Sequence, residues 1–307
     1  MNVRNFRQML EAQWAKDNFV CVGLDSEFNQ IKQFVRGGYD GNSFYSIMLN
    51  FSTSIINATK DLVCAYKPNI AFYEAYGSDG LKVLNSIIQY IRDFAPDIPV
   101  ILDAKRADIG NTNLGYAQLA FDSLRADAIT VHPYLGAEAL KPFLEKKNKG
   151  IIVLCRTSNP GAGEFQDLIV TPHLEEAKRW GIAWDSSDRG SSPCWIIDKM
   201  PLYQYIAYRV SREWNKNGNC ALVVGATYPD ELKEVRKIVG DMPVLIPGIG
   251  AQGGDVGKTV TAGKDSNGRG MIINSSRGII FASSGEDFAE AARRETLRLN
   301  DLINRYR

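Results

Sequence analysis

Acidic and basic residues alternate in one short segment, DAKRAD at 103–108, which directly follows an apolar run. Asp103 and Lys105 are two positions apart, so on an extended strand their side chains point to the same side. Lys67, at the end of another apolar run, is a natural third member of the group, and Asp108 follows after a turn. A lysine that is held charged between carboxylates keeps its proton until a strongly basic carbanion forms, and can then donate it. The segment therefore predicts proton transfer to a carbanion.

The same four charges could instead form a network of ion pairs that only fills the interior of a barrel. Buried ion pairs are in general more often structural than catalytic. Here, however, all four residues follow strands, at the end of the fold where barrel enzymes carry their active sites. We therefore favour the catalytic interpretation.

A second group of residues could bind phosphate. The turn PGIGAQGGD at 247–255 contains four glycines, Gly253 among them, so its backbone N–H groups can approach an anion closely. Arg277, in INSSRGI, follows the next apolar run and offers a planar pair of donors to phosphate oxygens. A glycine turn alone is more often only a tight turn. Its pairing with an arginine after the next strand matches the phosphate sites of barrels, which use the loops after strands seven and eight.

Eight short apolar runs provide the strands that must position these residues. Continuous hydrophobicity is typical of parallel strands that are buried on both faces. The runs are 19–24, 62–66, 100–102, 128–131, 151–154, 221–224, 244–246 and 271–273. Between them, apolar residues recur three or four positions apart and predict helices. These helices are 43–58, 79–94, 113–124, 138–146, 202–214, 229–239 and 288–306.

Strict alternation of strands and helices implies a parallel sheet, and eight repeats favour a closed (β/α)8 TIM barrel. The rival is an open doubly wound sheet, but neither Gly23 nor Gly248 begins a GxGxxG fingerprint. A polar, turn-rich stretch follows strand five, and loops of that length are usually functional or inserted. We expect one domain, 1–307, with an insertion around 165–200.

The bulk composition is ordinary, and it argues against several classes of partner. Lys plus Arg (36) nearly cancel Asp plus Glu (35), so we expect no nucleic-acid partner. No apolar stretch is long enough for a membrane span, and the N-terminus lacks a signal-peptide pattern. The five cysteines form no CxxC pair and the chain has two histidines, so we expect no disulfide framework, no metal site and a cytoplasmic location.

Three further residues at strand ends have ordinary explanations. Ser158 can simply cap the turn that contains Asn159 and Pro160. Asp25 can cap a following turn, or it can hold the hydroxyls of a ribose. His132 fits a polar strand-end residue whose hydrogen bonds are satisfied.

Taken together, these motifs resemble the orotidine 5′-phosphate decarboxylase family. ILDAKRADIGNTN looks like the family's Asp-x-Lys-x-x-Asp signature after strand three. Further matches follow the family's order along nearly the whole chain, and they fit its longer, bacterial-type branch best. They are VGLD, YKPN, TSNPGAGEFQDL, LVVGATYPDEL, PGIGAQGGD and SSRGI.

The resemblance implies that orotidine 5′-phosphate loses CO2 to give UMP, with no metal or organic cofactor. Lys105 would then protonate C6 of the pyrimidine, and Asp103 would lie against the departing carboxylate. Lys67 would hold Asp103 and a ribose hydroxyl, while Asp25 would bind the ribose.

The remaining residues implied by the resemblance hold the base, the phosphate and a partner subunit. Ser158 would face the edge of the pyrimidine, and Gln252, with the adjacent Gly253, and Arg277 would hold the phosphate. Asp108 and Thr112 would reach into the site of the partner subunit, so the resemblance implies a homodimer.

Three alternatives remain open. A related barrel enzyme decarboxylates a β-keto sugar phosphate with Mg²⁺, but it needs an added acidic ligand that DAKRAD lacks. A Schiff-base aldolase would use Lys67 or Lys105 as a neutral amine, which neighbouring aspartates disfavour. A non-catalytic binder of nucleotide phosphates is possible because a fold does not fix a function.

Overall fold

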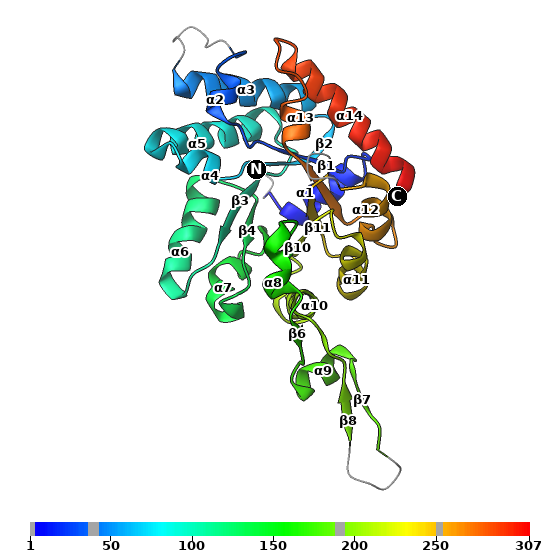
Figure 1. Cartoon of the computed structure of the whole chain (residues 1–307). Helices are drawn as coiled ribbons and strands as arrows, with labels where there is room; N and C mark the ends of the chain where they lie inside the picture. The colour runs from blue at the N-terminus through cyan, green and yellow to red at the C-terminus, as the bar shows by residue number, and fades with distance from the viewer. Residues whose placement is uncertain (1–3, 36–42, 188–193, 250–253) are drawn as a thin grey trace.

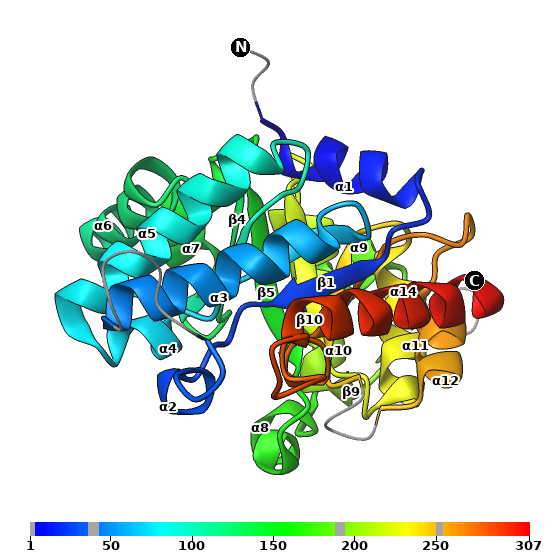
Figure 2. The same cartoon turned by 90° about the horizontal axis from the view of Figure 1, so that it is seen from above.

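The computed structural model describes residues 4–35, 43–187, 194–249 and 254–307. In these residues eight parallel strands form one sheet that curves into a barrel, with helices around it (Figures 1 and 2). The strands are β1 (Val20–Gly23), β2 (Val63–Lys67), β3 (Ile101–Arg106), β4 (Ala128–Val131), β5 (Gly150–Arg156), β10 (Cys220–Val224), β11 (Val244–Pro247) and β12 (Met271–Ser275). Neighbouring strands follow the order β2-β1-β12-β11-β10-β5-β4-β3.

The barrel closes between β2 and β3, the two ends of this order. The amide of Tyr66 donates to the carbonyl of Pro99 (3.1 Å), and the amide of Asp103 donates to the carbonyl of Pro68 (3.0 Å). These bonds bring the carboxyl end of β2 beside Asp103. The predicted (β/α)8 barrel is confirmed.

All eight predicted runs overlap barrel strands, and 128–131 matches β4 residue for residue, whereas 100–102 covers only the start of β3. The reason is their burial: every residue of β1, β2, β4, β10 and β12 is buried. Strands that are covered by helices on one side and by the barrel interior on the other need apolar side chains on both faces.

Each predicted helical segment also overlaps a helix, and 229–239 and 288–306 have the same bounds as α11 and α14. Two predicted helices, 113–124 and 202–214, finish as the wider π-helical turns η1 (Leu119–Ser123) and η3 (Arg209–Trp214). The helices are α1 (Phe6–Trp14), α2 (Phe28–Ile31), α3 (Phe44–Thr59), α4 (Ala71–Glu74), α5 (Gly77–Phe94), α6 (Gly110–Gln118), α7 (Gly136–Leu144), α8 (Gly163–Gln166), α9 (Leu174–Trp180), α10 (Leu202–Tyr208), α11 (Pro229–Val239), α12 (Val256–Gly263), α13 (Arg277–Ile280) and α14 (Phe288–Tyr306). No helix in the described part of the chain has the length and hydrophobicity that a membrane span requires.

The C-terminal helix α14 fixes β1, the strand that precedes Asp25. Asn300 on α14 is buried, and its Oδ1 accepts from the backbone amides of Phe19 (3.1 Å) and Val20 (3.3 Å) at the start of β1. Its Nδ2 donates to the carbonyl of Leu62 just before β2 (2.5 Å). One buried amide thus joins α14 to two neighbouring strands.

An arm, of which residues 169–187 and 194–201 are described, projects from the barrel after β5 (Figure 1). It contains the short antiparallel pair β6 (Ile169–Val170) and β9 (Met200–Pro201), the helix α9, and the hairpin of β7 (Ala183–Asp185) and β8 (Trp195–Ile197). Trp180 of α9 stacks on Tyr208 of α10, with ring centroids 5.2 Å apart, which fastens the arm to the barrel. The arm overlaps the turn-rich stretch around 165–200 that stands out in the sequence.

The hairpin of the arm contributes little to the core, and we expect the barrel to fold without it. The carbonyl of Ile182 accepts from the amide of Asp198 (3.2 Å), so the two ends of the hairpin are adjacent. Replacing 183–197 by Asn-Gly should change Tm by less than about 4 °C, roughly 1 kcal/mol for a chain of this size. The replacement mainly removes the interaction of the Lys178 ammonium with the ring of Trp195 (4.2 Å). Thermal unfolding followed by circular dichroism checks this, and loss of a cooperative transition would contradict it.

Candidate active site

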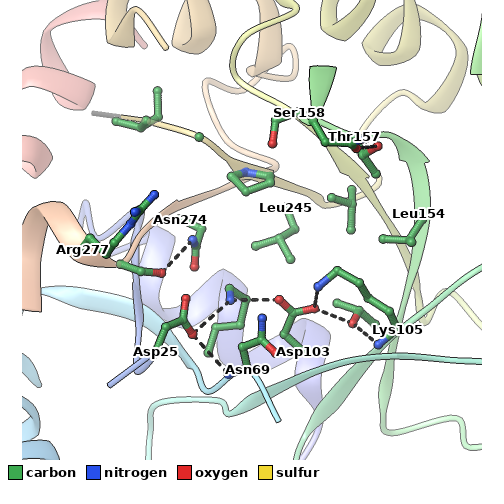
Figure 3. A pocket seen from close by; sticks show the side chains of 18 of the residues that line it. Asp25, Asn69, Asp103, Lys105, Leu154, Thr157, Ser158, Leu245, Asn274 and Arg277 are labelled. Atoms are coloured by element: carbon green, nitrogen blue, oxygen red, sulfur yellow. Dashed lines mark hydrogen bonds and ion pairs between the residues drawn. The ribbon is translucent and has the colours of Figure 1, made fainter. Parts of the chain in front are cut away.

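A cavity of about 580 Å³ opens at the carboxyl ends of the barrel strands (Figure 3). Charged groups line one side of it, and the side chains of Leu154, Val223 and Leu245 form an apolar wall. Of the residues predicted from the sequence, the cavity brings together Asp25, Lys67, Asp103, Lys105, Ser158 and Arg277.

Asp103 lies between two lysines on the charged side of this cavity. Its Oδ2 is 3.1 Å from Nζ of Lys67, and its Oδ1 is 2.7 Å from Nζ of Lys105. The hydroxyl of Thr130, on β4, donates to Oδ1 as well (2.8 Å). Both carboxylate oxygens are therefore occupied by donors, and two of these donors are cations.

Burial and ion pairing act in opposite directions on this group. Burial alone would raise the pKa of Asp103, but the attraction of Lys67 and Lys105 outweighs it, so the pKa of this carboxyl is well below its usual range. Burial alone would lower the pKa of Lys67, but Asp103 and Asp25 outweigh it, so the pKa of this ammonium is raised. Asp103 and Lys67 are thus both charged at neutral pH.

Lys105 reaches Asp103 by a different route from the one that the sequence suggested. The backbone of Lys105 is left-handed (φ 48°), and the pairing of β3 with β4 shifts register between Leu102 and Arg106. The expectation that Asp103 and Lys105 point to the same side of an ordinary extended strand is therefore wrong at Lys105. The Lys105 side chain is 48% exposed, so its ammonium lies at the mouth of the cavity. The hydroxyl of Thr130 supports the turn, because it accepts from the amides of Ala104 (3.0 Å) and Lys105 (2.9 Å).

Asp25 belongs to the same charged side. Its Oδ1 accepts from the amide of Asn69 (3.2 Å) and lies 3.9 Å from Nζ of Lys67. Lys67 is therefore placed between two carboxylates, one from the loop after β1 and one from β3. A residue that only capped a turn would not need its carboxylate to lie this close to a buried lysine.

The opposite rim of the cavity contains the residues predicted to bind phosphate. Pro247, Gly248 and Ile249 line it beside Arg277, the first residue of α13. Gly248 has φ 101°, which side chains disfavour, and its carbonyl accepts from the amide of Gly254 (3.2 Å), closing the base of the turn. Gln252 and Gly253 lie outside the described residues.

Ser158 lines the cavity on a third side, after β5. Gly225, directly after β10, makes room for it, because a Cβ there would lie 2.7 Å from the Cβ of Ser158. His132 and Thr227, also at strand ends, do not line the cavity.

Asp108 and Thr112 do not line the cavity of their own chain. Oδ1 of Asp108 accepts from the amide of Ile109 (2.7 Å), and Oδ1 of Asn113 accepts from the amide of Asp108 (2.8 Å). Thr112 is exposed on α6. Within one chain, Asp108 does not join Lys67, Asp103 and Lys105.

Comparison with known proteins gives consistent matches. The model of the "Orotidine 5'-phosphate decarboxylase / HUMPS family" matches residues 19–191. Orotidine 5'-phosphate decarboxylase of Janthinobacterium sp. is 45% identical over 302 residues, 98% of each chain. The solved structure of Leishmania donovani OMP decarboxylase is 34% identical, with a TM-score of 0.74 and coverage of 97% of this chain and 99% of that one. A putative orotidine-monophosphate-decarboxylase from Toxoplasma gondii is 35% identical, also with a TM-score of 0.74, and covers 98% and 99%.

The chain belongs to the orotidine 5′-phosphate decarboxylase family. The similarity extends over the arm as well as the barrel, since the alignments cover nearly the whole length of each chain. The residues that carried the resemblance in the sequence also meet in one cavity, with the exceptions of Asp108, Thr112 and the two residues of the glycine turn that are not described.

Two polar residues of this family member escaped the sequence analysis. Thr130 supports Asp103 and Lys105, and Asn274 lines the cavity between Asp25 and Arg277 (Figure 3). Oδ1 of Asn274 is buried and has no hydrogen-bond partner among the described residues. A polar residue inside an apolar run, as in AITV and MIINS, was the signal that could have identified both.

We expect Lys67→Met to lower the free energy of unfolding at pH 7 by about 3–5 kcal/mol, the usual result of removing one member of a buried ion pair, because Asp103 then keeps only the half-exposed Lys105 as its cation. The deficit should shrink as the pH falls toward about 4, because Asp103 then takes up a proton in the variant. In the wild type, Asp103 stabilises the fold because its pKa is lower in the folded than in the unfolded state. This contribution to stability is lost only as the pH falls below about 3.9, the pKa of aspartate in the unfolded chain. Urea unfolding at several pH values measures both effects.

Lys82→Met is the matched control. Lys82 forms an ion pair with Asp79 on the surface of α5, where both side chains are exposed. Its loss should change stability by less than about 0.5 kcal/mol. Equal losses in the two variants, or a Lys67→Met deficit that does not depend on pH, would show that the buried charges are not coupled as described.

Proposed function

We propose that this protein decarboxylates orotidine 5′-phosphate to UMP, the last step of de novo pyrimidine nucleotide synthesis, and is therefore a carboxy-lyase. The observation that carries the proposal is the Lys105 ammonium, 2.7 Å from Asp103 at the mouth of a cavity whose opposite rim carries Arg277. The names of the relatives agree with it.

The reaction breaks the bond between C6 and the carboxylate, and the electron pair of that bond stays on C6. A fixed ammonium beside C6 stabilises the developing negative charge more than it stabilises the substrate, which is the requirement for catalysis. Lys105 then donates its proton to C6, and UMP results. Asp103 remains ionised because of Lys67, so it repels the substrate carboxylate until neutral CO2 leaves.

The rest of the cavity holds the parts of the nucleotide that do not react. Asp25 and Lys67 suit ribose hydroxyls, because one accepts and the other donates hydrogen bonds. Arg277, with Gln252 and Gly253, binds the phosphate, and Ser158 meets the edge of the pyrimidine. Binding energy from the phosphate, remote from C6, serves to align the base.

The alternative activities fit the cavity less well. A Schiff-base aldolase needs a neutral lysine, but the pKa of Lys67 is raised by the two carboxylates despite its burial. A Mg²⁺-dependent decarboxylase needs carboxylates that are available to the metal, whereas Asp25 and Asp103 already face Lys67. A protein that only bound nucleotide phosphates would not need Lys105 to be held against a buried carboxylate.

The active form that we propose is a homodimer in which Asp108 and Thr112 complete the site of the partner subunit. Around them the surface is apolar: Ile109 and Leu114 are more than half exposed, and Tyr134, in the loop after β4, is 89% exposed. A second copy of the chain would cover these side chains and bring Asp108 to the other cavity.

The cytoplasm is the proposed compartment, because all five cysteines are free. Four of them are buried, and burial raises the pKa of the Cys21 and Cys220 thiols to about 12. Such thiols act as small apolar side chains.

The purified protein should convert orotidine 5′-phosphate to UMP in the presence of EDTA, as followed by the change in pyrimidine absorbance. Lys105→Met should lower kcat by about 10³-fold or more, because it removes both the charge and the proton donor. Lys82→Met, which removes an exposed lysine, should retain full activity. Turnover that requires added Mg²⁺, or an active Lys105→Met variant, would refute the proposed reaction.

Mixing two inactive variants tests the shared site. Lys105→Met and Asp108→Asn are each expected to be nearly inactive alone. Random pairing makes half of the dimers mixed, and each mixed dimer has one intact site, so about one quarter of the wild-type activity should return. Full activity of Asp108→Asn alone, or no recovery in dimers that exchange subunits, would rule out a shared site.

A further inference from the structure

The segment that joins β5 to the arm forms one wall of the active-site cavity. Arg156 ends β5 and is only 3% exposed, and Gln166 ends α8 and lines the cavity together with Thr157 and Ser158. This segment, residues 156–168, is the root of the arm. It is therefore part of the site, although the hairpin of the arm lies far from the barrel (Figure 1).

Arg156 ties this segment together. Its Nη2 donates to Oδ2 of Asp167 (3.1 Å), and its Nη1 lies within hydrogen-bond distance of Oε1 of Gln166 (3.4 Å). The guanidinium also lies 3.9 Å from the ring centre of Tyr228, in the loop after β10. A buried arginine needs such partners, because an unpaired charge in the interior is very unfavourable.

Gln166 in turn holds the turn that carries Ser158. Its Oε1 accepts from the amide of Thr157 (2.9 Å), and its Nε2 donates to Oγ1 of Thr157 (3.0 Å). From the other side, the amide of Gly225 donates to the carbonyl of Arg156 (2.8 Å), and the missing side chain of Gly225 lets Ser158 lie directly against β10. The Ser158 turn is thus fixed from both sides.

We propose that Arg156, Gln166 and Asp167 form a clasp that positions the Ser158 turn against the pyrimidine, so that the root of the arm determines base recognition. The three are positioning residues, because they act through the turn. The inference rests on the proposed function, which places the pyrimidine beside Ser158. A purely structural role would weaken binding of the whole ligand. The clasp, in contrast, affects binding of the base and leaves binding of the phosphate, at Arg277, unchanged.

Two ligands distinguish an effect on the base end of the site from an effect on the phosphate end. UMP contains the base, whereas ribose 5-phosphate lacks it, and titration calorimetry gives Kd for each. Gln166→Met keeps the length of the side chain and removes both hydrogen bonds to Thr157. It should raise Kd for UMP about tenfold, in line with the loss of a small hydrogen-bond network, and change Kd for ribose 5-phosphate by less than about twofold.

Glu164→Met is the matched control, since Glu164 is exposed on the same helix α8 and lies outside the clasp. It should leave both Kd values unchanged. Gln166→Glu keeps the acceptor for the Thr157 amide and for Arg156, and should recover most of the UMP affinity. If Gln166→Met does not fold, Asp167→Asn carries the same test, because Asp167 is half exposed and its change disturbs only the ion pair with Arg156.

The double variant of Gln166→Met and Ser158→Ala shows whether Gln166 acts through the turn. We expect the two changes in UMP affinity to be less than additive, because each removes the same interaction with the base. Full additivity, or equal weakening of UMP and ribose 5-phosphate, would overturn the clasp. Failure of the proposed function looks different: the wild-type protein itself would then neither bind UMP nor convert orotidine 5′-phosphate.

Discussion

The carboxylate of Asp103 carries a full negative charge at a place where the residue is only 8% exposed. It does so because two ammonium groups and one hydroxyl surround it, and each comes from a different position in the barrel: Lys67 ends β2, Lys105 lies on β3 itself, and Thr130 lies on β4. The barrel must close between β2 and β3 to bring Lys67 to Asp103, so the charge depends on the complete fold. Removing Lys67 leaves the buried carboxylate with only the half-exposed Lys105 as its cation.

This arrangement also fits the two roles that we propose for Lys105, a stabilising charge and a proton donor. Lys67 is buried between Asp25 and Asp103 and serves to hold charges, whereas Lys105 is half exposed at the mouth and can meet a substrate. The left-handed backbone at Lys105 produces this difference, because it turns the side chain out of the strand direction while Asp103 still reaches it. Backbone strain of this kind is typical of functional positions. The side chains of Leu154, Val223 and Leu245 give the other side of the cavity an apolar lining, and charges interact more strongly beside apolar groups than in bulk water.

Much of this could be predicted from the sequence, because the information is local. Apolar runs gave the positions of all eight strands, and the polar residue after each run gave Asp25, Lys67, Asp103 and Arg277. What could not be predicted depends on contacts between distant segments. The turn at Lys105 depends on Thr130, some 25 residues further along, and the π-helical ends of two helices depend on packing. The helix α12 was missed because VGKTVTAG contains small and β-branched residues without a clear helical pattern, and Gln166 was missed because its role lies in hydrogen bonds to the Ser158 turn.

In the proposed mechanism the ammonium of Lys105 gives a proton to C6 of the pyrimidine. By microscopic reversibility, the same group should slowly remove and return the C6 hydrogen of the product. The most direct measurement is proton NMR of UMP in D2O with the enzyme present. We expect the C6 hydrogen signal of UMP to disappear with the wild-type protein and to persist with Lys105→Met. Exchange at the wild-type rate in Lys105→Met would contradict it.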